Sequence, residues 1–180
     1  MLFRSDTPHG DYALNLLNER NCRVSEGLYR NSVSLAMATL ALPFVEKECG
    51  AQPGNLWNPG PDSTAAIRGV LDTLFKPQTM MNRMTLSAER VLILQPLFGD
   101  AQSKEKLVEA KSYPHSRELL LIRTAVAEED TAETERQWRP ASARRRSGSK
   151  RERSDNGGDG PKRRRRGRRS GRGHEKNRGE

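Results

Sequence analysis

The stretch VSLAMATLALPFV, residues 33–45, is the most apolar part of this 180-residue chain. Its large side chains are interleaved only with small ones, so a helix formed here is apolar on most of its sides. Such a helix needs packing partners all around it. Its 13 residues are too few to span a bilayer, which takes about 20. The stretch therefore predicts a buried helix.

Capping residues and prolines set the expected ends of the first helices. Ser25 is a favourable N-cap, so the apolar stretch is expected to belong to a longer helix that begins there. Pro43 is expected to kink or end that helix, because proline lacks an N–H group and crowds the preceding turn. Upstream, Asp11 is expected to cap a short helix.

The segment 50–61 is dense in glycine, proline and asparagine, which predicts a loop. Trp57 lies inside it, and we expect its ring to fold back onto the core rather than to serve as an exposed contact. After this loop, Asp62 or Ser63 is expected to cap an amphipathic helix that Pro77 ends. Its apolar face consists of Ile67, Val70, Leu71, Leu74 and Phe75.

Further helices are expected from Ser87, over 103–111 as a weak polar helix, and after Pro114 and Ser116 as far as Val126. Because no alternating apolar and polar run is long enough for a strand, the sequence predicts an all-α domain. We expect five or six helices with prolines at the corners.

Charge is divided sharply at Trp138. Residues 139–180 hold 17 Lys/Arg and 5 Asp/Glu, a net charge of +12, whereas residues 1–138 carry −3. The C-terminal part also lacks aliphatic or aromatic side chains larger than alanine or proline. Without apolar surface to bury, it is expected to be disordered on its own. The sequence thus predicts a helical domain, 1–138, and a basic arm, 139–180.

The arm is expected to bind nucleic acid, RNA in particular, with little regard for sequence. Guanidinium groups pair bidentately with phosphate, and the arm has no aromatic residue to stack on bases. If half of its cations engage single-stranded RNA, log K should fall with log salt with a slope of roughly −6. The expected binding residues are Arg144, Arg145, Arg146, Lys150, Arg151, Arg153, Lys162, Arg163, Arg164, Arg165, Arg166, Arg168, Arg169 and Arg172.

Two other uses of the arm remain open. The run 162–166 would also serve as a nuclear localisation signal for import receptors. Serines among the arginines are candidate phosphorylation sites, and each phosphate would add about −1.5 to −2 charges and weaken RNA binding. These serines are Ser147, Ser149, Ser154 and Ser170.

Nothing in the sequence indicates an enzyme, a cofactor or a metal site. His9, His115 and His174 are far apart and lack neighbouring ligands, so each is expected to be an ordinary surface residue. Cys22 and Cys49 form no CxxC motif and are expected to be reduced. No signal peptide and no membrane span are expected.

Two classes of function remain. One is a helical domain that assembles with copies of itself and packages nucleic acid on its arms. The other is a regulatory, shuttling RNA-binding protein, for which LSAERVLILQPL at 86–97 would be an export-like leucine run. Core packing is the plainer explanation of that run.

The layout resembles the core (capsid) proteins of hepadnaviruses and nackednaviruses. Three features carry the resemblance: the linker start Trp138-Arg139-Pro140, the run Ser116-Arg117-Glu118-Leu119-Leu120, and serines set among tail arginines. It implies a homodimer through a helical hairpin of about 25–48 and 62–75, with 116–138 joining dimers into a shell. The tail would face inward on RNA and DNA, and the protein would occur in the virion and in the host cytoplasm and nucleus.

The apolar helix gives a second reason to expect a dimer. A small monomer of five helices would have difficulty covering the 33–45 stretch, so a second copy is expected to cover part of it.

Overall fold

The computed structural model describes residues 7–75 and 82–140, and this part of the chain is helical without a strand. Two short 3-10 turns, Gln95–Gly99 and Ala101–Ser103, separate the fourth and fifth helices. The all-α prediction is confirmed. The α-helices of the described residues are α1 (Pro8–Ser25), α2 (Val33–Glu48), α3 (Pro61–Phe75), α4 (Asn82–Ile93), α5 (Lys104–Glu109), α6 (Tyr113–Val126) and α7 (Thr131–Gln137).

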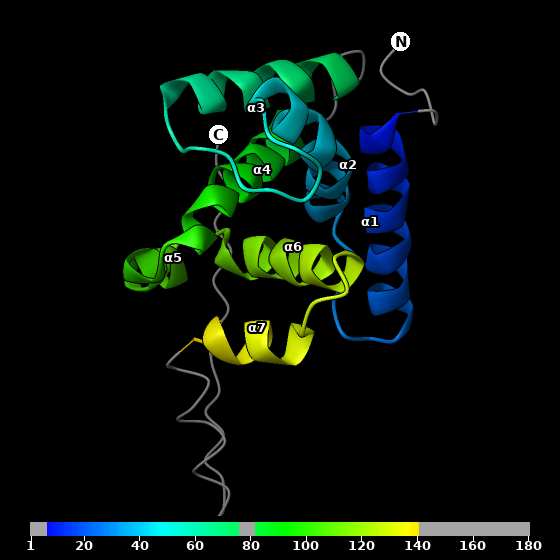
Figure 1. The fold of residues 1–180 in the computed structure, drawn as a ribbon, viewed down its shortest axis with the longest axis vertical. Helices are drawn as coiled ribbons and strands as arrows, with labels where there is room; N and C mark the ends of the chain where they lie inside the picture. Colours follow the sequence, from blue (N-terminus) through cyan, green and yellow to red (C-terminus); the bar gives the residue numbers. More distant parts are fainter. Residues whose placement is uncertain (1–6, 76–81, 141–180) are drawn as a thin grey trace, which may run out of the picture.

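Helix α2 is the centre of the main core. It contacts α1, α3, α4 and α6, which surround it in Figure 1. Leu35, Leu42 and Val45 on this helix are almost completely buried. One chain therefore covers most of the apolar stretch by itself, although Val33 at its start is 47% exposed, so the expected difficulty for a monomer does not arise. The apolarity of α2 no longer argues for a dimer.

Pro43 does not end the helix, contrary to the sequence-based expectation. Helix α2 continues through Pro43 to Glu48. An interior proline costs a helix about 3 kcal/mol, but Phe44 and Val45 directly after it are both buried in the core. Burying two such side chains contributes a comparable free energy, about 1.5–3 kcal/mol each. Packing therefore outweighs the local penalty.

The first helix boundary was also misplaced. Ser25 is the last residue of α1, where its hydroxyl donates to the Cys22 carbonyl oxygen, while Ser32 accepts a hydrogen bond from the Leu35 N–H and is the N-cap of α2. Gly27, with φ +73°, ends α1 in the left-handed conformation that glycine adopts without strain. At the other end of α1 the N-cap is Thr7, followed by Pro8, rather than Asp11.

Two later helices begin earlier than expected. Helix α3 begins at Pro61 instead of after Asp62 or Ser63, and α4 begins at Asn82, five residues before Ser87. The expected face of α3 is correct, with Ile67, Val70 and Leu71 buried.

The loop after α2 and the leucine run 86–97 both pack into the core. Trp57 is buried, which confirms the folded-back alternative. Val91 and Leu92 are completely buried, so the centre of the leucine run packs in the core, whereas Leu86 at its start is 53% exposed.

Among the described residues, no helix has both the length and the apolar composition needed to cross a bilayer.

Candidate nucleic-acid interface

Every basic residue predicted to bind nucleic acid, 144–172, lies outside the described residues, as do the four candidate phosphorylation sites. What the structure describes is the point from which the arm departs. The last buried residue of the helical domain is Trp138, whose side chain is 2% exposed. Among the described residues, which end at 140, the change in composition thus follows the last buried residue.

Trp138 is held in a small aromatic core that is separate from the one around α2. Its ring meets that of Phe98 edge-on at a centroid distance of 4.7 Å, and Phe98 stacks on Tyr113 at 6.3 Å. Leu107 completes the buried cluster. The Tyr113 hydroxyl donates a hydrogen bond to the Trp138 carbonyl oxygen. Ring packing and this hydrogen bond together fix the backbone where the arm begins.

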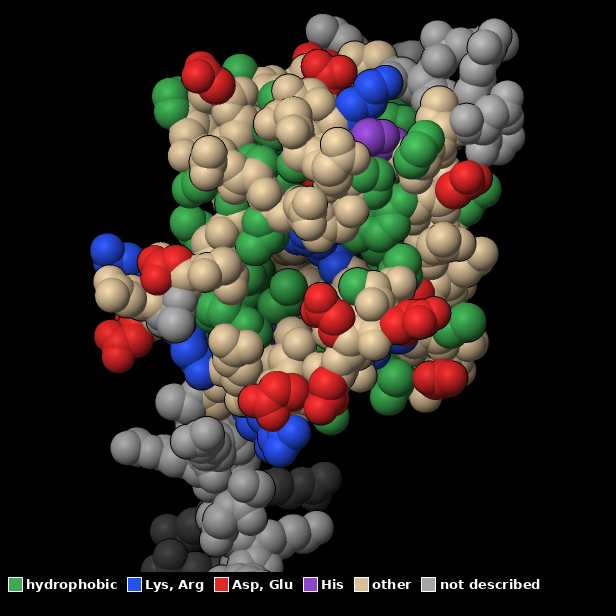
Figure 2. All heavy atoms as spheres, viewed as in Figure 1, with side chains coloured by type: hydrophobic (Ala, Val, Ile, Leu, Met, Phe, Trp, Pro, Cys, Tyr) green, Lys and Arg blue, Asp and Glu red, His purple; other side chains and the backbone are tan. Residues whose placement is uncertain are grey.

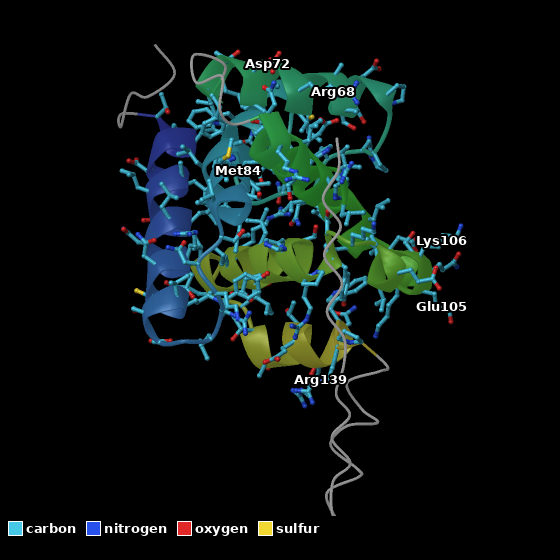
Figure 3. The ribbon with its side chains drawn as sticks, turned by 180° about the vertical axis from the view of Figure 1, so that it is seen from behind. Arg68, Asp72, Met84, Glu105, Lys106 and Arg139 are labelled. Carbon is cyan, nitrogen blue, oxygen red and sulfur yellow. The ribbon has the colours of Figure 1, made fainter. Side chains whose placement is uncertain are left out.

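Lys104 reinforces the anchor from α5. Its Nζ lies 5.9 Å from the centre of the Trp138 ring and donates to the Gln137 carbonyl oxygen at the end of α7. Both contacts suit a cation, which is attracted to the face of an indole and to the negative end of a helix. Figure 3 shows the Arg139 side chain below α7, while Glu105 and Lys106 extend from α5 to one side.

The acidic run 128–135 forms the exposed rim beside the arm's origin, where Figure 2 shows acidic side chains along the edge of the domain. Asp130 caps α7 by accepting hydrogen bonds from the N–H groups of Ala132 and Glu133. Glu135 pairs with Arg117 at 3.0 Å and lies 4.0 Å from Arg139. This run is therefore an exposed loop and the exposed face of α7, with capping and pairing roles.

Five arginines of the helical domain are paired with carboxylates of the same domain. Nucleic-acid phosphates would have to displace these partners, whereas the arm's net charge of +12 offers cations in excess. The net positive charge of the chain thus lies in residues 139–180, whereas residues 1–138 carry −3. The ion pairs are Arg23–Glu118, Arg68–Glu89, Arg117–Glu135, Arg123–Glu46 and Arg136–Glu133.

One of these pairs is buried in the domain. Arg123 Nη2 lies 3.4 Å from Glu46 Oε1 and donates to the Gly54 carbonyl oxygen at 2.9 Å, while the Gly54 N–H donates to Glu46 Oε2 at 3.0 Å. The pair thereby pins the loop after α2 to the core. Burial raises the pKa of Glu46 to about 7, although Arg123 and the Gly54 hydrogen bond oppose the shift. Burial likewise raises the pKa of Tyr12, which feels the charges of both partners.

The raised pKa of Glu46 predicts that folding stability falls as pH rises from about 5 to 8. The folded chain keeps the Glu46 proton up to a pH near 7, whereas the unfolded chain releases it near 4.5. Rising pH therefore favours the unfolded chain over this range, by on the order of 1–3 kcal/mol. Urea unfolding at pH 5, 6, 7 and 8 measures the effect.

Glu46→Gln is the matched control, because a neutral amide resembles the protonated carboxyl and does not titrate. The stability of the variant relative to the natural chain should rise between pH 5 and 8. His115, whose pKa is lowered by burial, titrates in both proteins and cancels in the difference. A difference that does not change with pH would contradict the assignment.

The cysteines and histidines that could carry chemistry or bind a metal do not come together in the described residues. Cys22 and Cys49 are free, as expected. His115 is half-buried rather than an ordinary surface residue, with its Nε2 2.9 Å from Ser32 Oγ and its ring edge-on to Tyr29. Within the described ranges no group of His, Cys, Asp or Glu is arranged to hold a metal ion. His174 lies outside these ranges.

The residues that anchor the arm and those of the buried pair were not predicted from the sequence. Phe98, Tyr113 and Lys104 are spread over 16 residues of sequence with no periodic signal. Arg123 carries a weak sequence signal, because it directly follows the apolar run 119–122. A cation beside such a run often pairs with a buried acid, but the sequence did not indicate which.

One protein family matches this chain. The family model described as "Polymerase A arginine-rich C-terminus" matches residues 57–171, which is more than half of the chain and includes both the aromatic anchor and most of the arm. It is not a hepadnavirus core family. No curated protein and no solved structure matches the chain. An arginine-rich family and a strongly cationic arm together mark a nucleic-acid-associated protein.

Proposed function

Because the chain belongs to the Polymerase A arginine-rich C-terminus family, we propose that it is the nucleic-acid-holding part of a polymerase system. The arm binds RNA phosphates with little regard for sequence, and the helical domain fixes the arm's origin in space. In this proposal the chain contributes no catalytic residue of its own, and the polymerase active site is formed by other residues.

The observation that carries the proposal is a net charge of +12 in residues 139–180, which begin at a fixed point on a domain whose own net charge is −3. A tethered polycation raises the local concentration of RNA near whatever the tether is attached to. The anchor at Trp138 sets that position, since the backbone there is held by Tyr113 and Lys104. In this proposal the arm provides the affinity for RNA, and the helical domain determines where the bound RNA is held.

The full chain and a version ending at Trp138 test the proposal directly. Fluorescence anisotropy with a labelled U12 RNA should show tight binding by the full chain and at least a 100-fold loss on truncation at 100 mM salt. The slope of log K against log salt should be roughly −6 for the full chain. If the truncated chain binds as tightly, the arm is not the binding element and the proposal fails.

A capsid role, implied by the resemblance to hepadnavirus and nackednavirus core proteins, is the second candidate. Its support is the layout of a helical domain followed by an arginine-rich arm. The buried position of α2 removes one reason to expect a dimer through that helix. Light scattering and negative-stain microscopy separate the two candidates: uniform shells from residues 1–138 would establish a capsid, and a small species would favour the polymerase role.

Nuclear import through 162–166 and regulation by phosphorylation of the arm serines would both depend on the arm's positive charges. Complete phosphorylation of Ser147, Ser149, Ser154 and Ser170 is proposed to lower RNA affinity about tenfold, because it removes about half of the arm's net charge. Binding measured after treatment with a basophilic kinase checks this. Unchanged affinity would reject regulation by this route.

A further inference from the structure

An open groove lies between the end of α4 and the turn that joins α5 to α6. Its volume is about 310 Å³, at the lower end of the range typical of ligand sites. Two segments of the chain, far apart in sequence, line the groove together. The lining residues are Arg90, Ile93 and Leu94 from the end of α4, and Ala110, Lys111 and Ser112 from the α5–α6 turn.

The floor of the groove is aliphatic and is supported from beneath by both cores of the domain. Ile93 packs against the main core around α2, whereas Leu94 and Ala110 pack against the small aromatic core that holds Trp138. All three side chains are only partly buried, so each leaves apolar surface open in the groove. The groove is therefore a formed feature at the seam between two packed clusters.

The rim of the groove is cationic. Arg90 and Lys111 are both exposed, and no carboxylate of the described residues forms an ion pair with either. Glu89, the acid of α4, is engaged by Arg68 at 2.8 Å. Glu109 is exposed just before the α5–α6 turn but is not one of the lining residues, none of which is acidic. The groove thus offers two unpaired cations on a domain whose net charge is −3.

An aliphatic floor between cations is complementary to a peptide that carries leucine or isoleucine between carboxylates. The aliphatic side chain would leave water by covering Ile93 and Leu94, and the carboxylates would lie near Arg90 and Lys111. Single-stranded RNA fits the groove less well. Bases bind chiefly by stacking on aromatic side chains, and no lining residue is aromatic.

We propose that this groove binds an acidic, leucine- or isoleucine-containing segment of another protein. The acidic run 128–135 of a second copy of this chain does not fit, because it contains no aliphatic side chain larger than that of alanine. The inference goes beyond the proposed function, since it gives the helical domain a protein partner. It does not depend on RNA binding by the arm.

Three fluorescein-labelled peptides, DELLDE, DEAADE and NQLLNQ, test the proposal by fluorescence anisotropy with the full chain in 150 mM salt. We expect DELLDE to bind at least tenfold more tightly than DEAADE, because burial of one leucine side chain provides about that factor. It should also bind at least fivefold more tightly than the neutral NQLLNQ. DELLDE and DEAADE carry the same charge, so any attraction to the basic arm cancels in their ratio.

The double variant Arg90→Glu/Lys111→Glu locates the binding. It should lower the affinity for DELLDE at least tenfold, because both rim charges then repel the peptide. The matched control is Lys47→Glu/Lys106→Glu, which makes the same change of charge at exposed positions outside the groove. Figure 3 shows Lys106 extending outward from α5. The control should lower the affinity threefold or less.

Equal affinity for DELLDE and DEAADE would overturn the proposal. A leucine preference that Arg90→Glu/Lys111→Glu retains in full would overturn it too, because the peptide would then bind elsewhere. If that variant melts at a lower temperature than the natural chain, Arg90→Gln/Lys111→Gln replaces it, with an expected loss of at least threefold. A tenfold weaker binding of U12 RNA by the groove variant than by the control variant would make the groove an RNA surface and contradict a peptide site.

Discussion

Replacing the eight cations of residues 162–172 with glutamine should weaken U12 binding by about 100-fold or more at 100 mM salt. These residues hold nearly half of the arm's 17 Lys/Arg. If half of the arm's cations contact phosphates, the substitution removes about four contacts, each of which contributes about 0.7 to the salt slope. The slope should therefore change from about −6 to about −3. Anisotropy titrations from 50 to 400 mM salt measure both quantities.

A lysine version of the same block separates charge from guanidinium geometry. It keeps every positive charge, so the salt slope should remain near −6. Lysine cannot pair bidentately with phosphate, and an affinity loss of less than tenfold is expected. Neutralising the six cations of 144–153 should have a somewhat smaller effect. A glutamine variant that binds like the natural chain would show that the arm is not the RNA-binding element.

The sequence predicted the fold class because helical periodicity and the absence of alternating runs are local signals. The face of α3, with Ile67, Val70 and Leu71 buried, is visible in the spacing alone. The buried position of α2 follows from its composition. Both predictions required only neighbours along one helix, and both are confirmed.

The errors came where two local signals compete. Ser25 and Ser32 are both acceptable caps, and Gly27 between them decides the matter by ending α1 in the left-handed conformation. Pro43 signals a break, but the burial of Phe44 outweighs it. Such balances depend on tertiary packing, which no single segment reveals.

The candidate site, too, could be predicted from the sequence only in part. The basic arm was identified from composition, because electrostatic binding depends on the number of charges and not on their arrangement. The anchor was not, because it brings together Phe98, Tyr113 and Trp138 from separate helical segments of the chain. No spacing rule connects these residues, so only the fold could show them together.

Trp138→Ala should destabilise the helical domain by about 3–5 kcal/mol, the usual cost of deleting a buried tryptophan side chain. The ring is 2% exposed and packs on Phe98, so its removal leaves a cavity in the small aromatic core. A loss of this size lowers the melting temperature by roughly 10 °C or more for a domain of about 130 residues. Thermal and urea unfolding of the full chain measure it.

Trp138→Phe is the control, since it keeps an aromatic ring against Phe98 and should cost much less. RNA affinity below the melting temperature should change less than threefold in both variants, because the arm keeps all of its charges. A large loss of stability together with nearly unchanged RNA affinity follows only if Trp138 fixes the arm in place without binding RNA itself. A 100-fold loss of RNA binding in folded Trp138→Ala would instead make Trp138 part of the binding surface. A melting temperature within 2 °C of the natural chain would mean that α7 and its anchor are separable from the domain, and that the arm's origin is not fixed.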